Sequence, residues 1–533
     1  MSASSLLRTV RRALLPALSG LLAGAAGLSV AQLIAQFIEP NSSPVIAVGG
    51  AAIDATPTPL KEYAIRNFGT NDKHVLLTGI LAVLAVLTMA IGIAAARRFI
   101  AGVVLVVALG VVAVTAELRR PNATAAYPLP TSIGLACALG LLYLLIRFRP
   151  HSMQTAGHNL TDDAAATNGV PDGPSGITVG SRRQFLITGA GVGAAAAVAL
   201  AVSNVVTSSK STAAARSKIK LPKATDPAKP LPEGVDLKVP GLSSFVTPNA
   251  KFYRVDTALS TPQVNPVTWK LKINGMVDKP FTLSYDDILS MPLVERDITM
   301  TCVSNEVGGP YVGTARWLGI PLKTLMNRAG MNPEADQLFA TSADGFTTST
   351  PTRIALDGRD AMVVVGMNGE PLPIAHGFPA RMIVPGLYGY VSGCKWLTSI
   401  TAATYAGKKA YWTQRKWDID GPIYTESRID VPASFAQVKA GIVPIAGVAW
   451  AQHRGVDKVE ISIDGGGWQS TTLAATPGID TWRQWWFKWE AKPGSHQIRV
   501  RATDSSGEPQ TDRRQGTFPR GATGIQEALV TVS

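Results

Sequence analysis

The stretch DITMTCVSNEVGGP, residues 297–310, contains the most informative cysteine of the chain. A run of β-branched and apolar residues ends at Cys302, and a glycine-containing turn follows, so the sequence predicts that Cys302 lies at a strand end. A thiolate is the soft ligand that heavy transition metals prefer, and a strand end can present it to a bound group. An exported domain could instead join Cys302 to Cys394 in a single disulfide. Three cysteines are too few for a disulfide framework.

A second stretch, HGFPARMIVPGLYGYVSGCKW at residues 376–396, combines three basic side chains with glycine-rich backbone. His376, Arg381 and Lys395 would direct hydrogen-bond donors at an anion such as a phosphate. The alternative is a buried His376 that is satisfied within the core, with Arg381 and Lys395 as surface charges.

Around these stretches the sequence predicts short strands and turns from about residue 246. Two helices are predicted, Tyr285–Ser290 and Leu322–Ala329, so residues 246–418 form an α+β domain dominated by strands. From residue 419 to 533 the pattern is purely β, with short strands at regular spacing. That spacing indicates an all-β, immunoglobulin-like sandwich.

The first two hundred residues are much more apolar and predict an α-helical membrane region. Five stretches have the length and composition of membrane spans: residues 14–38, 75–96, 99–116, 131–148 and 185–206. Residues 1–150 then hold four spans, 151–183 a polar cytoplasmic loop, 184–206 the fifth span and 207–245 an extended linker.

Arginine pairs flank these stretches on one side if the spans alternate in direction. Cytoplasmic flanks collect Lys and Arg, so the amino terminus is expected inside and everything after the fifth span outside. The connection 117–130, with Arg119 and Arg120, is the one exception. We therefore predict a multi-pass cell-membrane protein with an extracytoplasmic soluble half.

The segment SRRQFL, residues 181–186, precedes a mildly apolar run rich in Gly and Ala. It resembles a twin-arginine export signal placed inside the chain, although ordinary cytoplasmic anchoring by arginines is the alternative. Export in the folded state would suit a domain that is assembled around a cofactor before it crosses the membrane.

Charge and histidine placement argue against two other classes. The formal net charge is +13, but the basic residues are scattered or lie beside apolar stretches, which favours anionic lipid headgroups over nucleic acid as the partner. None of the six histidines lies inside an apolar stretch, so no intrinsic haem is expected.

Four motifs occur together in order: a strand ending in Cys-x-x-Asn (302–305), Arg-Trp-x-Gly (316–319), His-Gly-x-Pro-x-Arg (376–381) and Lys-Trp (395–396). This combination resembles the molybdopterin domain of the sulfite oxidase family. The resemblance covers about residues 246–530 and includes the terminal domain that mediates dimerisation in that family, so a homodimer is implied.

The resemblance also implies roles for individual residues. Cys302 matches the cysteine that binds the molybdenum. The matches to cofactor contacts are Phe252, Tyr253, Arg254, Val255, Asp256, Asp344, His376, Arg381, Gly393, Cys394 and Lys395. The matches to residues that line the substrate pocket are Arg254, Trp317 and Arg520, with Trp417 as a further wall.

Two departures bear on the substrate. Val307 stands where animal sulfite oxidases have a pocket arginine, and the stretch 414–418 lacks the family's active-site tyrosine. Sulfite would miss donors that a doubly charged anion needs. The expected activity is two-electron oxygen-atom transfer on a small sulfur-oxo or oxyanion substrate, with electrons exchanged with a separate carrier, for which the first four spans are a candidate docking site. The alternative is a non-catalytic, membrane-tethered binding protein.

Overall fold

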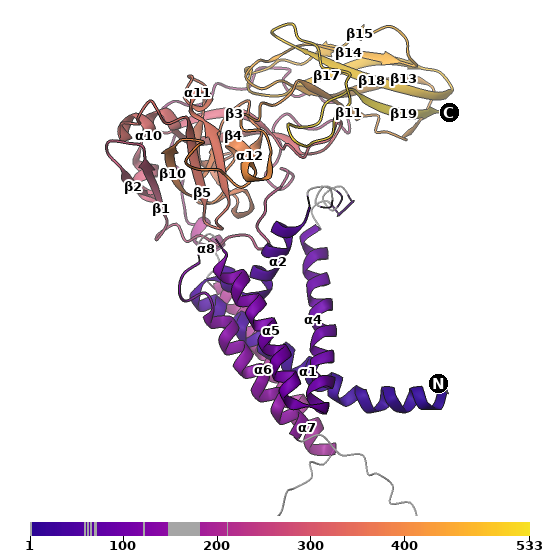
Figure 1. The fold of residues 1–533 in the computed structure, drawn as a ribbon. Helices are drawn as coiled ribbons and strands as arrows, with labels where there is room; N and C mark the ends of the chain where they lie inside the picture. Colours follow the sequence, from indigo (N-terminus) through magenta and orange to yellow (C-terminus); the bar gives the residue numbers. More distant parts are fainter. Residues whose placement is uncertain are drawn as a thin grey trace, which may run out of the picture. The chain divides into compact units, whose positions relative to one another are not determined.

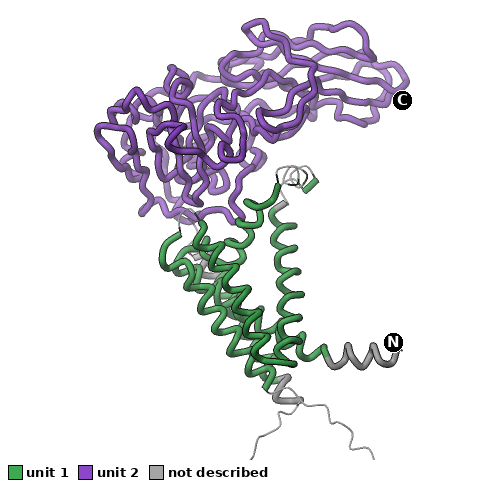
Figure 2. The backbone as a smooth tube through the Cα atoms, in the orientation of Figure 1, with its two compact units in different colours: residues 1–210 green, residues 211–533 purple. Residues whose placement is uncertain are grey.

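A computed structural model describes residues 3–57, 60, 63, 67, 68, 72–120, 123–147, 182–209 and 212–533. The chain divides into two compact units, Met1–Lys210 and Ser211–Ser533, which Figure 2 draws in different colours. The first unit is helical, and the second is built mainly of strands (Figure 1).

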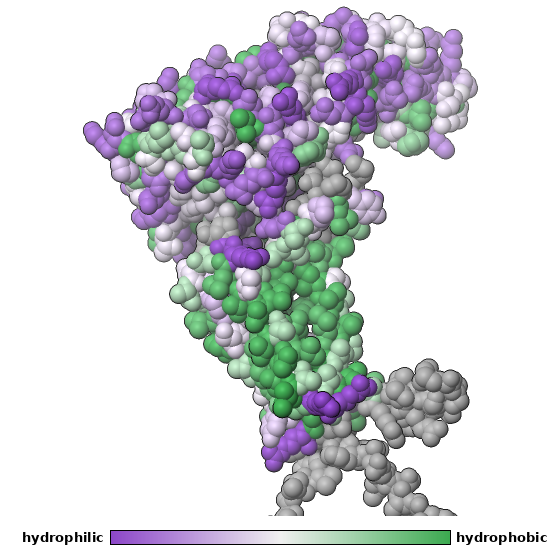
Figure 3. Space-filling view, viewed as in Figure 1, coloured by the Kyte–Doolittle hydropathy of each residue, from purple (hydrophilic) through white to green (hydrophobic). Residues whose placement is uncertain are grey.

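The helices of the first unit are α1 (Ala3–Ile38), η1 (Pro40–Ser42), α2 (Pro44–Ala55), α4 (Asp72–Arg97), α5 (Phe99–Leu118), α6 (Leu129–Arg147) and α7 (Arg182–Ser209). Four of them are long and apolar enough to cross a membrane: Ala13–Ile38, Lys73–Arg97, Phe99–Leu118 and Leu129–Arg147. Figure 3 shows apolar side chains over the visible surface of this helical unit. These helices agree with the first four predicted spans.

Small residues allow α1 to approach its neighbours closely. A Cβ added at Gly20 would collide with the Thr88 carbonyl of α4, and one added at Gly27 would lie 2.6 Å from the Gly134 carbonyl oxygen of α6. Close backbone contact at small residues is a common way to pack membrane helices, because lipid supplies no hydrophobic drive between them. α1 therefore packs against both α4 and α6.

Two features of this unit differ from the sequence-based expectation. The fifth predicted span is helical, but the described apolar part of α7, Ile187–Ser203, is shorter than the other four. Helix α2 was not predicted; it begins with Pro44 at its first position, where the missing N–H costs nothing.

Glu117, at the end of α5, is completely buried and accepts a hydrogen bond from Thr131 of α6. The side chains of the predicted export motif 181–186 lie outside the described residues.

The α+β part of the second unit, from β1 to β10, has two sheets and four short α-helices. One sheet has the order β2-β1-β10-β5-β6: β2 (Phe281–Ser284), β1 (Lys270–Gly275), β10 (Leu397–Ala403), β5 (Gln337–Ser342) and β6 (Thr347–Pro351). The other has the order β3-β4-β7-β8, with β9 beside β7: β3 (Val294–Thr301), β4 (Val312–Pro321), β7 (Met362–Met367), β8 (Glu370–Pro371) and β9 (Arg381–Ile383). The helices are α9 (Tyr285–Ser290), α10 (Leu322–Ala329), α11 (Thr352–Ala355) and α12 (Gly389–Ser392).

The two predicted helices are confirmed at the predicted bounds. Helix α9 begins with a capping box, in which Ser284 Oγ accepts from Asp287 N at 3.1 Å and Asp287 Oδ2 accepts from Ser284 N at 2.7 Å. Helix α10 buries Leu322 and Leu325 in the same apolar core that receives side chains from both sheets. This α+β domain carries most of the predicted site residues.

The last part of the chain consists of two sheets that share one core. One has the order β11-β13-β17-β16: β11 (Glu426–Val431), β13 (Gly441–Trp450), β17 (Arg483–Ala491) and β16 (Thr472–Leu473). The other has the order β12-β19-β18-β14-β15: β12 (Gln437–Val438), β19 (Gln526–Val532), β18 (Gly494–Asp504), β14 (Val456–Ile463) and β15 (Gln469–Ser470). Ile445 and Trp485 of the first sheet pack in one cluster with Ile461 and Val500 of the second, so the terminal part is a β sandwich.

Asp504, at the end of β18, is a buried carboxylate with several donors. Burial raises its pKa, but hydrogen bonds outweigh this effect and bring the pKa to about 2. The side-chain donors are Ser506 Oγ at 2.6 Å, Arg454 Nε at 2.8 Å and Thr425 Oγ1 at 2.9 Å. The carboxylate thus ties the sandwich to the segment that leads into it.

The predicted extended linker is fixed to the second unit. After the short helix α8 (Thr212–Arg216), the chain runs as coil, and Arg216 forms an ion pair with Glu370 at 2.7 Å and donates to the Leu372 carbonyl at 2.7 Å. Val235 and Phe245 are buried in a cluster that also contains sandwich residues. The coil therefore packs against the rest of the second unit.

Candidate active site

Cys302 follows β3 directly, as the sequence predicted. Its N–H donates to the Tyr311 carbonyl at 3.0 Å, and its sulfur accepts from Ser304 N at 3.4 Å. Asn305 closes the loop, because its N–H donates to the Cys302 carbonyl at 3.0 Å and its Oδ1 accepts from Tyr311 N at 2.7 Å. Burial raises the pKa of the half-buried Cys302 thiol, and the charge of Lys395 opposes this only partly. A thiolate here needs a further positive charge, which a metal ion supplies.

Arg381, at the start of β9, is 5% exposed although it is a guanidinium. Its Nη1 donates to the His376 carbonyl at 3.3 Å, and its Cζ lies 5.5 Å from the centre of the Trp317 ring. Its buried Nε has no hydrogen-bond partner among the described residues. Burial lowers the pKa of Arg381 to about 10, so the group stays charged at neutral pH. A buried cation with an unused donor fits an anionic ligand.

Lys395 is a second buried cation beside the same loop. Its Nζ forms an ion pair with Asp256 at 2.6 Å and donates to the Ala375 carbonyl at 3.4 Å. Burial lowers the pKa of Lys395 to about 8, while Asp256 acts to raise it. Gly377 has φ +111°, and a Cβ there would lie 3.1 Å from both Lys395 Cα and Arg381 Cβ. The glycine therefore lets the two basic side chains approach each other.

His376 is buried and neutral. Burial and the charges of Arg381 and Lys395 lower its pKa to about 4, and Nε2 lies 3.3 Å from the Asn249 carbonyl oxygen. The Phe252 ring meets the imidazole edge-on at 5.5 Å. A neutral imidazole can donate through one ring nitrogen and accept through the other, which suits a polar heterocycle.

The segment 252–256 covers this group of residues. The ring of Tyr253 stacks on Phe252 at 5.1 Å, and the pKa of Tyr253 is raised by burial and by Cys302 and lowered by Arg381. Arg254 Nε forms an ion pair with Asp256 at 2.9 Å and its Nη2 donates to Thr261 Oγ1 at 3.0 Å.

The remaining cofactor candidates lie around Arg381 or at the edge of this segment. A Cβ at Gly393 would come within 3.2 Å of Arg381 Nη2. Cys394 is completely buried and free, and burial and Asp344 both raise its pKa. Val255 is 36% exposed. Since Cys302 is free as well, the alternative of a disulfide between the two cysteines is wrong.

The two other residues predicted to line the substrate pocket, Trp317 and Arg520, differ in exposure. Trp317 has no exposed surface; it donates from Nε1 to the Ile298 carbonyl at 3.1 Å and packs beneath Phe252 and Arg381. Arg520 has a side chain that is 62% exposed and forms an ion pair with Asp418 at 3.1 Å.

Sequence reasoning named Trp417 but missed the aromatic residues that surround it beside Arg520. Trp417 lies 5.3 Å from Phe518, 5.5 Å from Tyr390 and 5.6 Å from Trp412, measured between ring centres. The clustering of aromatic residues at 411–417 was the available signal. Tyr390 belongs to α12, and its hydroxyl donates to the Asp418 carbonyl at 2.7 Å, so this group borders the loop that carries Lys395.

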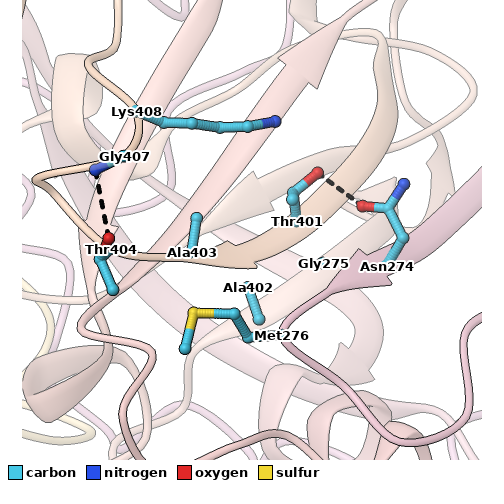
Figure 4. Close-up of a pocket in the computed structure, with 9 residues that line it drawn as sticks. All are labelled: Asn274, Gly275, Met276, Thr401, Ala402, Ala403, Thr404, Gly407 and Lys408. Atoms are coloured by element: carbon cyan, nitrogen blue, oxygen red, sulfur yellow. Dashed lines mark hydrogen bonds between the residues drawn. The ribbon is translucent and has the colours of Figure 1, made fainter.

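A shallow groove of about 510 Å³ lies at the ends of β1 and β10 (Figure 4). Its lining residues are Asn274, Gly275, Met276, Thr401, Ala402, Ala403, Thr404, Gly407 and Lys408. Thr401 Oγ1 donates to Asn274 Oδ1 at 2.6 Å between the paired strands β10 and β1 (Figure 4). None of the predicted site residues lines it, so we do not assign the chemistry there.

Comparison with known proteins identifies the domain that contains Cys302, His376, Arg381 and Lys395. Residues 258–412 match a family model described as the oxidoreductase molybdopterin binding domain. Mitochondrial sulfite oxidase of Mus musculus is 28% identical over 319 residues, which is 50% of this chain and 58% of the relative. Nitrate reductase [NADH] 1 of Oryza sativa subsp. japonica is 26% identical over 341 residues, 50% of this chain and 36% of the relative. The chain thus spans about half the length of the curated relatives it matches.

Among solved structures, the sulfane dehydrogenase SoxCD from Paracoccus pantotrophus aligns with a TM-score of 0.48 and 22% identity, covering 57% of this chain and 88% of that chain. The matched domain and the sulfite oxidase relatives imply a molybdenum–molybdopterin cofactor. The residues present fit that group, because Arg381 offers an unused buried donor and Cys302 offers a sulfur ligand. The chain therefore contains a molybdopterin-binding oxidoreductase domain at residues 258–412 and is similar in sequence to sulfite oxidases and nitrate reductases.

Proposed function

We propose that the soluble unit catalyses two-electron oxygen-atom transfer on a small sulfur-oxo or oxyanion substrate. The observation that carries the proposal is the buried guanidinium of Arg381, whose Nε lacks a partner among the described residues beside a neutral His376 and the buried Lys395. An unpaired buried cation destabilises the fold unless a ligand compensates it, so this group supports a bound anion such as the phosphate of the pterin.

In this proposal each residue has a defined task. Arg381 and Lys395 bind the phosphate of the pterin, and His376 hydrogen-bonds its polar rim. Cys302 holds the metal through its sulfur, on a loop that Asn305 keeps closed. When bound, the molybdenum centre supplies the oxygen-atom transfer, and the protein supplies binding, orientation and charge.

The substrate class follows from the basic residues at the entrance. Arg254 is held by Asp256 and Thr261, and 35% of its side chain is exposed, so it can meet a substrate oxygen. Val307 is an apolar residue in the Cys302 loop. By the resemblance described above, it takes the position of the pocket arginine in animal sulfite oxidases. A neutral S-oxide or a singly charged oxyanion therefore fits better than sulfite. In this proposal Arg520 and Trp417 would also line the substrate pocket.

The remaining parts of the proposal concern the setting of the enzyme. The apolar helices would anchor the chain in a cell membrane as a multi-pass protein, and the arginine flanks favour an extracytoplasmic soluble unit. Export would use the twin-arginine segment. Electrons would be exchanged with a separate, membrane-bound carrier. The terminal sandwich, which we infer to be immunoglobulin-like, would form a homodimer.

Metal analysis and activity assays test this proposal together. Purified full-length protein is expected to contain about one molybdenum and one pterin per chain, and to turn over sulfoxides or oxyanions faster than sulfite. Protein that binds neither molybdenum nor pterin after expression in a host that makes both would instead support the membrane-tethered binding protein.

A further inference from the structure

The terminal sandwich contacts the Cys302 loop through a buried arginine. Arg428 lies on β11 and is 9% exposed. Its Nη1 donates to the Gly309 carbonyl at 3.0 Å, seven residues after the cysteine. Its Nε donates to Asp430 at 2.6 Å and its Nη2 to Ser243 Oγ at 2.9 Å. Asp430 and Ser243 therefore fix the guanidinium group, and its Nη1 is left to donate to the loop.

A second contact holds the strand that leads into the cysteine. Gln452 is completely buried, and its Nε2 donates to Thr301 Oγ1 at 2.9 Å and to the Thr299 carbonyl at 3.3 Å. Trp482 N donates to Thr299 Oγ1 at 2.7 Å, and Thr299 N donates to the Asp480 carbonyl at 2.9 Å. The last residues of β3 are thus bound to the sandwich.

The loop itself passes close to the sandwich. Gly308 has φ +78°, and a Cβ there would lie 2.7 Å from Cδ of Gln526 on β19. The side-chain oxygen of Gln526 in turn accepts a hydrogen bond from Ile429 N at 2.6 Å. Val303, next to the cysteine, is 5% exposed and packs in one cluster with Trp450 of the sandwich. Residues on both sides of Cys302 are therefore held by the terminal domain.

We propose that Arg428 is a positioning residue for Cys302, so that the terminal sandwich sets the direction in which the sulfur meets its ligand. The inference rests on the proposed function, in which Cys302 holds the metal. A buried ion pair such as Arg428–Asp430 contributes little net stability but can specify one geometry. Through its hydrogen bond to the Gly309 carbonyl, the fixed guanidinium of Arg428 would hold the Cys302 loop in one conformation.

The test compares two double variants of the full-length protein in detergent. R428M/D430N removes the charged pair without leaving one charge buried alone, and the amide oxygen that it introduces at position 430 can still accept from Ser243 N. R501M/E460Q is the control, because Arg501 and Glu460 form another ion pair of the sandwich, at 2.9 Å between β18 and β14 of the other sheet, with Arg501 more exposed than Arg428. R428K, which keeps the charge but loses the guanidinium group, is the conservative variant.

Three measurements distinguish positioning from a merely structural role. In R428M/D430N, amide hydrogen exchange over residues 302–311 should rise at least tenfold, the molybdenum EPR signal should shift, and kcat should fall about tenfold with KM unchanged within twofold. R428K should lie between this variant and the parent, and the control should match the parent. If R428M/D430N does not fold, R428K alone must show the shifts in exchange and in EPR.

Unchanged hydrogen exchange and an unchanged EPR signal in the Arg428 variants would overturn the inference. If the parent protein still contains molybdenum, the proposed function would stand in that case. A parent protein without molybdenum would overturn the proposed function itself. Equal changes in the R501M/E460Q control would show a general effect of sandwich stability, and this too would refute a positioning role for Arg428.

Discussion

His376 gives a pH dependence whose sign and size follow from its surroundings. Its pKa is about 4 in the folded protein and 6.5 in the unfolded chain, because burial and two neighbouring cations disfavour the imidazolium. Between these values the unfolded chain binds the proton and the folded protein does not. His376 therefore stabilises the fold fully above pH 6.5, and this stabilisation is lost as the pH falls through 4. The difference of about 2.5 pKa units corresponds to about 3 kcal/mol.

The assay is denaturant unfolding of cofactor-free, full-length protein in detergent between pH 4 and 8, for the parent and His376→Gln. Glutamine keeps a polar side chain but does not titrate, so the parent should lose about 3 kcal/mol more than the variant on acidification. Cofactor-loaded protein should show a smaller loss, because a bound phosphate favours the imidazolium. A constant difference between parent and variant across this range would refute the reasoning about His376.

Three further predictions concern the pocket, the sandwich and export. Val307→Arg adds a charge-assisted donor worth about 1.5–3 kcal/mol, so the affinity for sulfite, measured through KM, should rise about 10- to 100-fold; unchanged steady-state kinetics would contradict the assigned pocket. Asp504→Asn should destabilise the sandwich by about 2 kcal/mol at pH 7, because the lowered pKa stabilises the fold above pH 3.8; the effect should vanish near pH 2, and a pH-independent cost in thermal unfolding would argue against it. Replacing Arg182 and Arg183 with Lys should trap a reporter fused after residue 230 in the cytoplasm, whereas normal export would exclude the twin-arginine interpretation.

Local signals predicted much of the soluble unit. The two helices were found at their observed bounds because each has its own start and stop signals and an apolar face. Cys302 at a strand end, and the approach of Arg381 to Lys395, followed from short motifs whose spacing reflects one loop structure. These motifs depend on residues that are close together in the sequence, so they could be recognised without knowing the rest of the fold.

Features that depend on distant contacts were not predictable. The partner of Lys395 is Asp256, 139 residues earlier in the chain, and no local pattern relates them. The complete burial of Trp317 depends on how the segment around Phe252 folds over it. The Arg428–Gly309 contact joins parts 119 residues apart. In the helical unit, the length rule for spans passed over the twelve-residue helix α2 because it is too short to cross a bilayer.

The most direct test of the central claim is the sulfur coordination of the metal. X-ray absorption at the molybdenum edge, measured on the parent protein and on Cys302→Ser, counts the sulfur atoms bound to the metal. If Cys302 is the ligand, the variant should keep its pterin, show one sulfur fewer and lose activity, because a hard hydroxyl replaces thiolate poorly. The same number of sulfur ligands in both proteins would contradict the assignment of Cys302 and the mechanism built on it.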